Sequence, residues 1–289
     1  MSLPKIVCPH NKTLLRSLQG YTVAVKVTGL HHAQKAARHV RESGNNLLCV
    51  MVESDSPLSD LDLWENLKGT PLAIMAPSLG KFRNLAKGLN LLRDLDLRVY
   101  LPCNHPDNIV ALRILSSVGI HSCAVFGDGG TDWDALTDLM TYAVLERVPH
   151  ASIEPFAFIA SNYDPSAYLE WGSIWFDDPR HFLHLDATGR VALYRGDLKA
   201  RKFIAHDLSK IEEDAEFPAI RERTNRWRRL LAENHHCASC VGWKACLGRF
   251  APNKPGNNGC SAFFREMLET ACQNRARKLQ NEESRVWQP

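Results

Sequence analysis

The chain has 289 residues, of which 45% are apolar and nine are cysteines, and it carries a formal net charge of +3 at pH 7. No apolar run reaches the roughly 18 residues that a membrane-spanning helix requires, and interleaved acidic and basic residues disfavour nucleic acid as a partner. An odd number of cysteines and the lack of an apolar signal segment in residues 1–20 disfavour an oxidising compartment. We therefore expect a cytoplasmic protein without a membrane partner.

Six strand-like apolar runs begin about 25 to 30 residues apart, which is the length of one strand-plus-helix unit. They lie at residues 21–27, 47–53, 71–77, 97–103, 122–128 and 152–160. Apolar residues three and four apart predict helices between them, at residues 31–43, 58–67, 81–95, 106–117 and 132–147. Runs rich in Val, Ile, Leu and Ala are typical of sheets that are buried on both faces. The pattern predicts an α/β fold with a parallel array, either a partial (β/α)6 barrel, which we favour, or an open doubly wound sheet.

This alternation stops after residue 160. Residues 181–194 alternate apolar and polar side chains around the turn Asp186-Ala-Thr-Gly189, which predicts a β-hairpin. We expect a charged helix at residues 212–233 and a terminal helix at residues 261–279, with a cysteine-rich block between them. The change of pattern predicts two domains, residues 1–170 and 171–289.

The cysteine-rich block is the strongest chemical signal. Four of the nine cysteines fall within 24 residues, and a turn-forming loop follows the third; they are Cys237, Cys240, Cys246 and Cys260. A C-x-x-C turn places two sulfurs on the same side of a tight loop, so the four thiolates can converge on one metal centre. Structural disulfides are disfavoured by the expected reducing compartment. The spacing alone leaves both zinc and an iron–sulfur cluster open.

Six β/α units, a hairpin that turns at a glycine, and the motif C-x2-C-x5-C-x-G with a later cysteine resemble a known group. The chain is similar to the radical SAM enzymes that carry a C-terminal SPASM or twitch auxiliary-cluster domain, many of which modify ribosomally made peptides. The resemblance implies that Cys237, Cys240, Cys246 and Cys260 hold one [4Fe–4S] cluster. Under this resemblance, residues 1–170 correspond to the barrel and residues 171–289 to a small SPASM/twitch-like domain.

The departures from this family are equally informative. The family binds its SAM-cleaving cluster through C-x3-C-x2-C after the first strand, and the matching positions here are His31, Lys35 and Arg38. Lysine and arginine are cations without a free acceptor, so they do not replace cysteine as iron ligands. Tyr194 and Phe250 stand where the family has cysteines for an inner auxiliary cluster. The resemblance therefore implies a degenerate member with one cluster and no SAM-cleaving cluster.

Catalytic residues are not identified by any motif in this sequence. Chemistry in β/α barrels takes place at the carboxyl ends of the strands, where the candidates are His31, Glu53, Asp55, His105 and Asp128. Each candidate also has a purely structural interpretation. Aspartates after a strand commonly cap a helix, as we expect of Asp132, and His31 and Glu53 can simply pair with each other.

Two functional classes follow. The first is an accessory protein that binds a precursor peptide or a catalytic maturation subunit, with residues 171–176 and 226–229 as candidate contact surfaces because they are rich in Trp and Arg. The second is an enzyme that uses its single cluster for electron transfer or the barrel mouth for chemistry without SAM. A zinc-stapled binding protein is a third interpretation. For residues 171–176 and 226–229, internal packing is the alternative to a contact surface.

Overall fold

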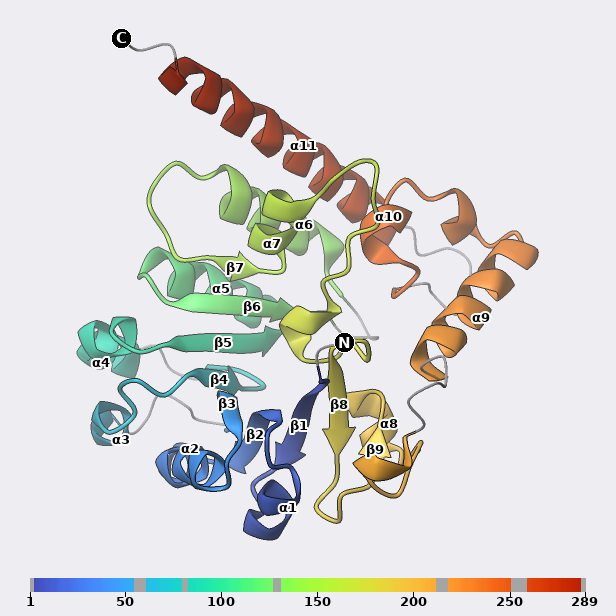
Figure 1. Cartoon of the computed structure of the whole chain (residues 1–289). Coiled ribbons are helices and arrows are strands. Elements are labelled where there is room, and N and C mark those ends of the chain that lie inside the picture. Colours follow the sequence, from blue (N-terminus) through green and yellow to red (C-terminus); the bar gives the residue numbers. More distant parts are fainter. Residues whose placement is uncertain are drawn as a thin grey trace. The chain divides into compact units, whose positions relative to one another are not determined.

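The computed structural model describes residues 3–54, 61–79, 83–126, 131–211, 218–250 and 259–286 (Figure 1). Asp55 and Asp128, two of the candidate catalytic residues, lie outside the described residues. The chain divides into two compact units, each made of two separate segments. Unit 1 comprises Met1–Leu101 and Gly172–Asn225, and unit 2 comprises Pro102–Trp171 and Arg226–Pro289.

Unit 1 is built on a mostly parallel sheet with the strand order β5-β4-β3-β2-β1-β8-β9. Among the strand pairs that the structure describes in this unit, only β8 with β9 is antiparallel. The strands are β1 (Lys5–Pro9), β2 (Thr22–Thr28), β3 (Asn46–Glu53), β4 (Leu72–Met75), β5 (Leu97–Pro102), β8 (Phe182–Leu185) and β9 (Val191–Ala192). Their helices are α1 (Lys12–Ser17), η1 (Leu30–His32), α2 (Ala33–Glu42), α3 (Leu61–Glu65), α4 (Arg83–Arg93), η2 (Gly172–Trp175), α8 (Arg195–Lys199) and η3 (Leu208–Lys210).

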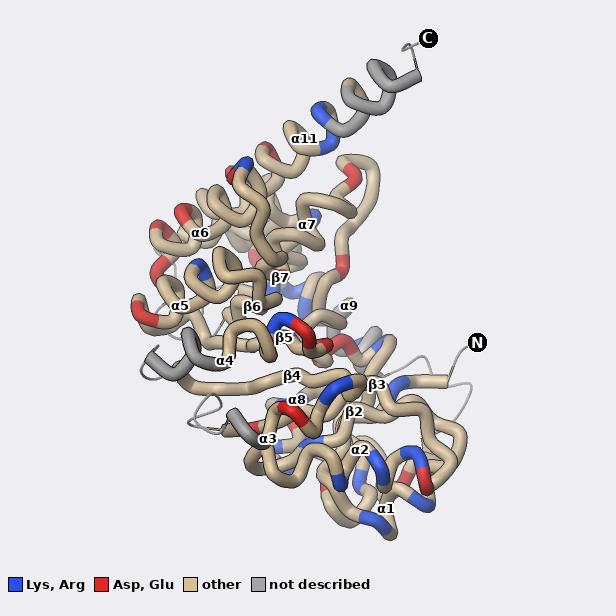
Figure 2. The backbone as a smooth tube through the Cα atoms, turned by 90° about the vertical axis from the view of Figure 1, so that its left-hand side faces the viewer, with Lys and Arg blue, Asp and Glu red and all other residues tan. Residues whose placement is uncertain are grey.

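The two faces of this sheet differ in chemistry. Residues paired directly across a sheet share a face, and successive residues of one strand alternate between faces. One face carries apolar side chains such as Val25, Val50 and Ile74, and α2 packs on this part of the sheet with Ala36 and Val40 buried. The opposite face carries polar side chains, which are Lys26, Glu53, Arg98, Tyr100 and His184. Figure 2 shows Lys and Arg gathered along α1 and α2, where they are mostly solvated.

Unit 2 contains a short parallel strand pair covered by helices. The strands are β6 (His121–Val125) and β7 (Ile153–Glu154), and the helices are α5 (Pro106–Ser117), α6 (Trp133–Leu145), α7 (Phe156–Asn162), η4 (His236–Ser239), α10 (Trp243–Cys246) and α11 (Gly259–Val286). Helix α9 (Pro218–Ala232) enters this unit at Arg226. The buried side chains Phe263, Phe264 and Met267 lie on α11, which packs against α6 and α7. A long amphipathic helix thus closes the core of unit 2.

The structure confirms the α/β class, the parallel pairing and the hairpin. All six predicted runs contain a strand, but residues 156–162 form helix α7 rather than the end of the sixth strand. Strand β1 was not predicted, and it lies between β2 and β8 in the sheet. The partial barrel and the domain division at residues 170 and 171 stay predictions. Among the described helices, none has both the length and the apolar character needed to cross a lipid bilayer.

Candidate metal centre

Two tight turns carry the first three cysteines of unit 2. The side chain of His235 caps η4, because its Nδ1 accepts the Cys237 N–H at 3.3 Å. Within the first turn, the Cys240 N–H donates to the Cys237 carbonyl at 3.3 Å, and the Trp243 N–H donates to the Cys240 carbonyl at 3.0 Å. The C-x-x-C segment is therefore closed by its own backbone, as a metal-binding turn requires.

The second turn follows Cys246 at the end of α10. Leu247 has φ 53° and Gly248 has φ +68°, both in the left-handed region that reverses the chain. In this turn the Arg249 N–H donates to the Cys246 carbonyl at 3.0 Å, and the backbone N–H groups of Phe250, Arg249 and Gly248 act to lower the pKa of the Cys246 thiol. Such donors stabilise a thiolate, and they are a common feature of sulfur ligands in metal sites.

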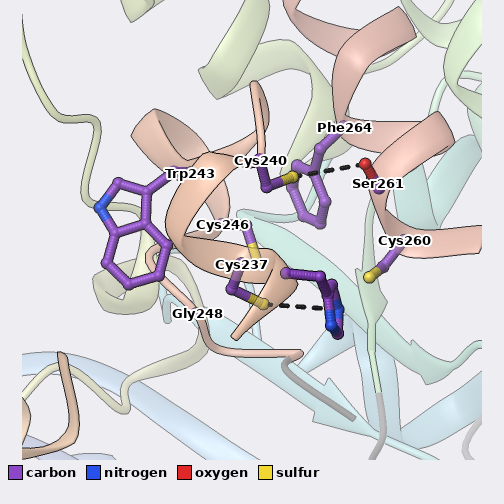
Figure 3. Close-up of a pocket in the computed structure, with 9 residues that line it drawn as sticks. Cys237, Cys240, Trp243, Cys246, Gly248, Cys260, Ser261 and Phe264 are labelled. Atoms are coloured by element: carbon purple, nitrogen blue, oxygen red, sulfur yellow. Dashed lines mark hydrogen bonds between the residues drawn. The ribbon is translucent and has the colours of Figure 1, made fainter. Parts of the chain in front are cut away.

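Cys260 comes from a different element, the first turn of α11. Together, the loop and this helix end form a pocket (Figure 3), lined by His236, Cys237, Cys240, Trp243, Cys246, Gly248, Cys260, Ser261 and Phe264. The sulfur atoms of all four predicted ligands surround this common space. Cys237, Cys246 and Cys260 are buried, Cys240 is half-buried, and all nine cysteines of the chain are free thiols.

The electrostatics of the pocket favour the binding of a cation. Burial raises the pKa of Cys237 to about 11, and the other three cysteines of the pocket add to this effect. Burial also raises the pKa of Cys246 to about 11 and raises the pKa of Cys260. Thiolates brought this close repel one another, so without a cation the thiols hold their protons. A metal ion or cluster removes this repulsion and displaces the protons.

Neighbouring elements hold the second turn in place. Arg226 on α9 donates from Nη2 to the Gly248 carbonyl at 2.7 Å, and Trp227 Nε1 donates to the Leu247 carbonyl at 2.9 Å. From the other segment of unit 2, Trp171 Nε1 donates to the Ala245 carbonyl at 2.8 Å. These bonds use groups from both surfaces that the sequence suggested as partner contacts. Arg226 and Trp227 therefore make contacts within the chain, and Trp171 and Trp175 are buried.

An aromatic cluster lies beside the pocket. Phe250, at a position where the sequence analysis noted a cysteine in the radical SAM pattern, stacks on Phe264 with ring centres 5.7 Å apart. It also contacts Phe126, Trp133 and Trp171, with ring centres 5.5, 5.8 and 6.2 Å away. As the sequence suggested, Phe250 fills its position with apolar packing. Through Phe264, the cluster supplies an apolar wall of the pocket.

Two polar side chains beside the sulfurs were not predicted. His236 Nε2 lies 3.7 Å from the Cys237 sulfur, and Ser261 Oγ lies 3.4 Å from the Cys240 sulfur (Figure 3). Among the described residues, His235, His236 and Cys237 are the trio whose possible ligand atoms all lie within 4.8 Å of one another. The run His235-His236-Cys237 was visible in the sequence as a signal for metal binding.

The remaining candidates that the structure describes, His31, Glu53 and His105, each make local contacts. His105 caps α5, because its Nδ1 accepts the Asp107 N–H at 3.3 Å, and Asp132 caps α6, as predicted. His31 and Glu53 are both exposed, and within the described part of the chain no hydrogen bond or ion pair joins their side chains. The His31 ring instead lies against that of His32, with ring centres 3.9 Å apart.

No family model and no curated protein matches the sequence of this chain. Two crystal structures of SuiB from Streptococcus suis are similar in structure, one of them bound to S-adenosylmethionine. The first has 11% sequence identity and a TM-score of 0.46 over 75% of this chain and 67% of SuiB. The second has 10% identity and a TM-score of 0.48 over 75% of this chain and 65% of SuiB. At TM-scores below 0.5, this likeness carries no inference about the activity of the present chain.

Proposed function

We propose that this chain is an iron–sulfur protein in which Cys237, Cys240, Cys246 and Cys260 hold one [4Fe–4S] cluster. The observation that carries the proposal is that four cysteines from two turns and a helix end line one pocket. Backbone N–H donors at the Cys246 sulfur and the apolar wall around Phe264 fit such a group, because hydrogen bonds to sulfur and exclusion of solvent tune bound clusters.

The spacing of the sulfurs favours a cluster over zinc. A zinc ion bound to thiolates at about 2.3 Å holds the sulfurs of its tetrahedron roughly 3.8 Å apart. Here no three of the four cysteine sulfurs lie within 4.8 Å of one another. A group with four irons separates its ligand sulfurs further than a single ion does, so it suits this wider arrangement.

Metal analysis under anaerobic conditions tests this assignment. We expect reconstitution with iron and sulfide to load about four irons per chain, and Cys240→Ser to lose them. The matched control is Cys272→Ser, because Cys272 is exposed on α11 and does not line the pocket. One tightly bound zinc per chain in anaerobically purified protein would overturn the iron–sulfur assignment and favour the zinc-stapled alternative.

We further propose that the chain does not cleave SAM. The three positions that match the cluster motif of the related family carry exposed side chains that are not cysteines, namely His31, Lys35 and Arg38. The other thiols of unit 1, Cys8 and Cys49, are buried on two different strands, β1 and β3, so they do not replace the missing three-cysteine loop. Incubation of the reconstituted protein with SAM and a strong reductant should release no 5′-deoxyadenosine; its formation would contradict this proposal.

A chain with one iron–sulfur cluster and no SAM cleavage fits best an accessory role in the maturation of a ribosomally made peptide or protein. Its partner would be the precursor peptide or a catalytic maturation subunit, and Arg228 and Arg229 on α9 remain exposed for such a contact. Co-purification with neighbouring maturation proteins should recover a complex, and reversing the charge of both arginines should weaken it without changing the iron content. If the isolated chain instead turns over a substrate at rates typical of enzymes, the alternative of an enzyme that works without SAM is favoured.

A further inference from the structure

The polar face of the unit 1 sheet brings chemically reactive side chains from distant segments together. Val7 on β1 pairs with Ala24 on one side and with His184 on the other, so these three residues share a face. Lys26 lies two residues beyond Ala24 on the same strand and therefore on the same face. A histidine and a lysine thus project from β8 and β2 toward the same side of the sheet.

His184 is a buried polar side chain that is only partly paired. Its side chain is 0% exposed, and its Nε2 lies 3.3 Å from Asp177 Oδ1. Its Nδ1 has no hydrogen-bond partner among the described residues. Buried polar groups are almost always hydrogen-bonded, to the protein or to a bound molecule, so the unpaired Nδ1 points to a missing partner.

Arg195, at the start of α8, adds further donors to this face. Its Nε is buried without a hydrogen-bond partner among the described residues, while its Nη2 donates to the Trp175 carbonyl at 3.3 Å. The Arg195 backbone N–H donates to Asp177 Oδ1 at 2.9 Å, the carboxylate oxygen that also lies beside His184 Nε2. The Nη2 bond therefore holds the arginine side chain in place, while its Nε still lacks a hydrogen-bond acceptor among the described residues.

Lys26 completes the group as a second, largely buried cation. Burial lowers the pKa of Lys26, and the nearby Arg195 guanidinium lowers it further. The Glu53 carboxylate acts in the opposite direction on the pKa of Lys26, but burial and Arg195 outweigh it. Two like charges this close repel, and an anion between them would relieve the repulsion that the nearby carboxylate leaves.

We propose that Lys26, His184 and Arg195 form a binding site in unit 1 for the oxyanion of a small ligand, either a carboxylate or a phosphate group. The lysine ammonium and the arginine Nε donate to the oxygens, and the imidazole donates through the nitrogen that carries its proton. The site lies in the unit that does not contain the pocket cysteines, so it is independent of the iron–sulfur assignment.

Titration of the full-length protein with orthophosphate and, separately, with acetate tests the site by calorimetry. We expect saturable binding of one of the two probes at one site per chain. Lys26→Met should weaken this binding by about tenfold or more, which is the worth of one charge-assisted hydrogen bond. Lys202→Met is the matched control, because Lys202 is an exposed cation shortly after the end of α8, and this variant should bind like the wild type.

Two further measurements make the outcome decisive. Circular dichroism establishes that Lys26→Met is folded, and Arg195→Met provides a second variant with the same expected loss. The bound probe should also raise the melting temperature of the wild type but not of either variant. The proposal is overturned if the wild type binds neither probe saturably, or if folded Lys26→Met and Arg195→Met bind as tightly as the wild type.

Discussion

Gly248 illustrates how one backbone angle supports the metal centre. It has φ +68°, and a Cβ at this position would lie 2.9 Å from Leu230 Cδ1 and 3.1 Å from Trp243 Cζ3. We expect Gly248→Ala to destabilise unit 2 by about 1–2 kcal/mol through the left-handed backbone alone. It should also reduce iron content, because the turn that presents Cys246 shifts.

Urea unfolding and iron analysis of the same samples check this prediction. Gly196→Ala is the matched control, since Gly196 lies in α8 and a Cβ there meets nothing within 4 Å. That control should be as stable as the wild type or slightly more stable. If both variants lose stability and iron content equally, the effect is not specific to the turn at Cys246.

Ser261 provides a second test at the level of single residues. Its hydroxyl lies 3.4 Å from the Cys240 sulfur. A hydrogen bond to a ligand sulfur stabilises the more negative, reduced state of a cluster, so Ser261→Ala should lower the reduction potential without loss of iron. A redox titration monitored by absorbance measures this shift. The control is Ser239→Ala, whose hydroxyl donates to the His236 carbonyl at 3.4 Å rather than to a sulfur, and it should leave the potential unchanged.

At the scale of elements, α9 holds the turn after Cys246 through hydrogen bonds. Arg226 Nη2 binds the Gly248 carbonyl at 2.7 Å and the Arg249 carbonyl at 3.4 Å. Arg226→Met should therefore loosen the turn after Cys246 and lower iron occupancy, whereas Arg228→Met, on the same exposed helix, should not. Iron analysis after a mild chelator challenge distinguishes the two variants. If the Arg226 and Arg228 variants keep their iron equally well, the Arg226 hydrogen bonds are not needed to hold the cluster.

The sequence predicted most of these elements because their patterns are local. The predicted helix at residues 106–117 matches α5, which begins at a proline, the residue that favours the first helical turn. Strand β1 escaped prediction because it has only five residues, and it is defined by its pairing with β2 and β8 rather than by its own pattern. Element type was thus readable from the chain, while neighbours in the sheet were set by tertiary pairing.

The same distinction applies to the metal centre. Cysteine spacing pointed to Cys237, Cys240, Cys246 and Cys260, because short spacings constrain a loop directly. It could not reveal that Ser261 approaches Cys240, since that contact joins residues 21 positions apart across a helix end. Nor could it show that Arg226 hydrogen-bonds to the turn after Cys246, because the charge pattern of a helix does not state which of its arginines contacts another loop.

At the scale of the whole molecule, the stability of unit 1 should depend on pH. Burial lowers the pKa of His184. Burial acts to raise the pKa of Asp177, but the contacts with His184 and the Arg195 N–H outweigh it and hold that pKa below its usual value. Both groups therefore bind fewer protons in the folded than in the unfolded state at acidic pH, so stability falls as pH falls.

The two groups act in different pH windows. The contribution of His184 is fully present above its unfolded pKa of about 6.5 and is lost below it, at up to about 1.4 kcal/mol per pH unit. That of Asp177 is lost only below about 3.9. Urea unfolding at pH 7.5, 6 and 5 should show the first loss, and His184→Phe should flatten it. The exposed His206 offers a matched control, because His206→Phe should keep the slope of the wild type.

Trp243, which lines the pocket beside the four cysteines, gives the protein a built-in optical reporter. A cluster with iron absorbs across the near-ultraviolet and visible range in which indole emits, whereas zinc, with its filled d shell, does not. Indole emission from the folded protein should therefore dim when iron and sulfide enter the pocket and stay bright with zinc. Indole fluorescence would therefore follow the assembly of the centre in real time and would distinguish bound iron from bound zinc.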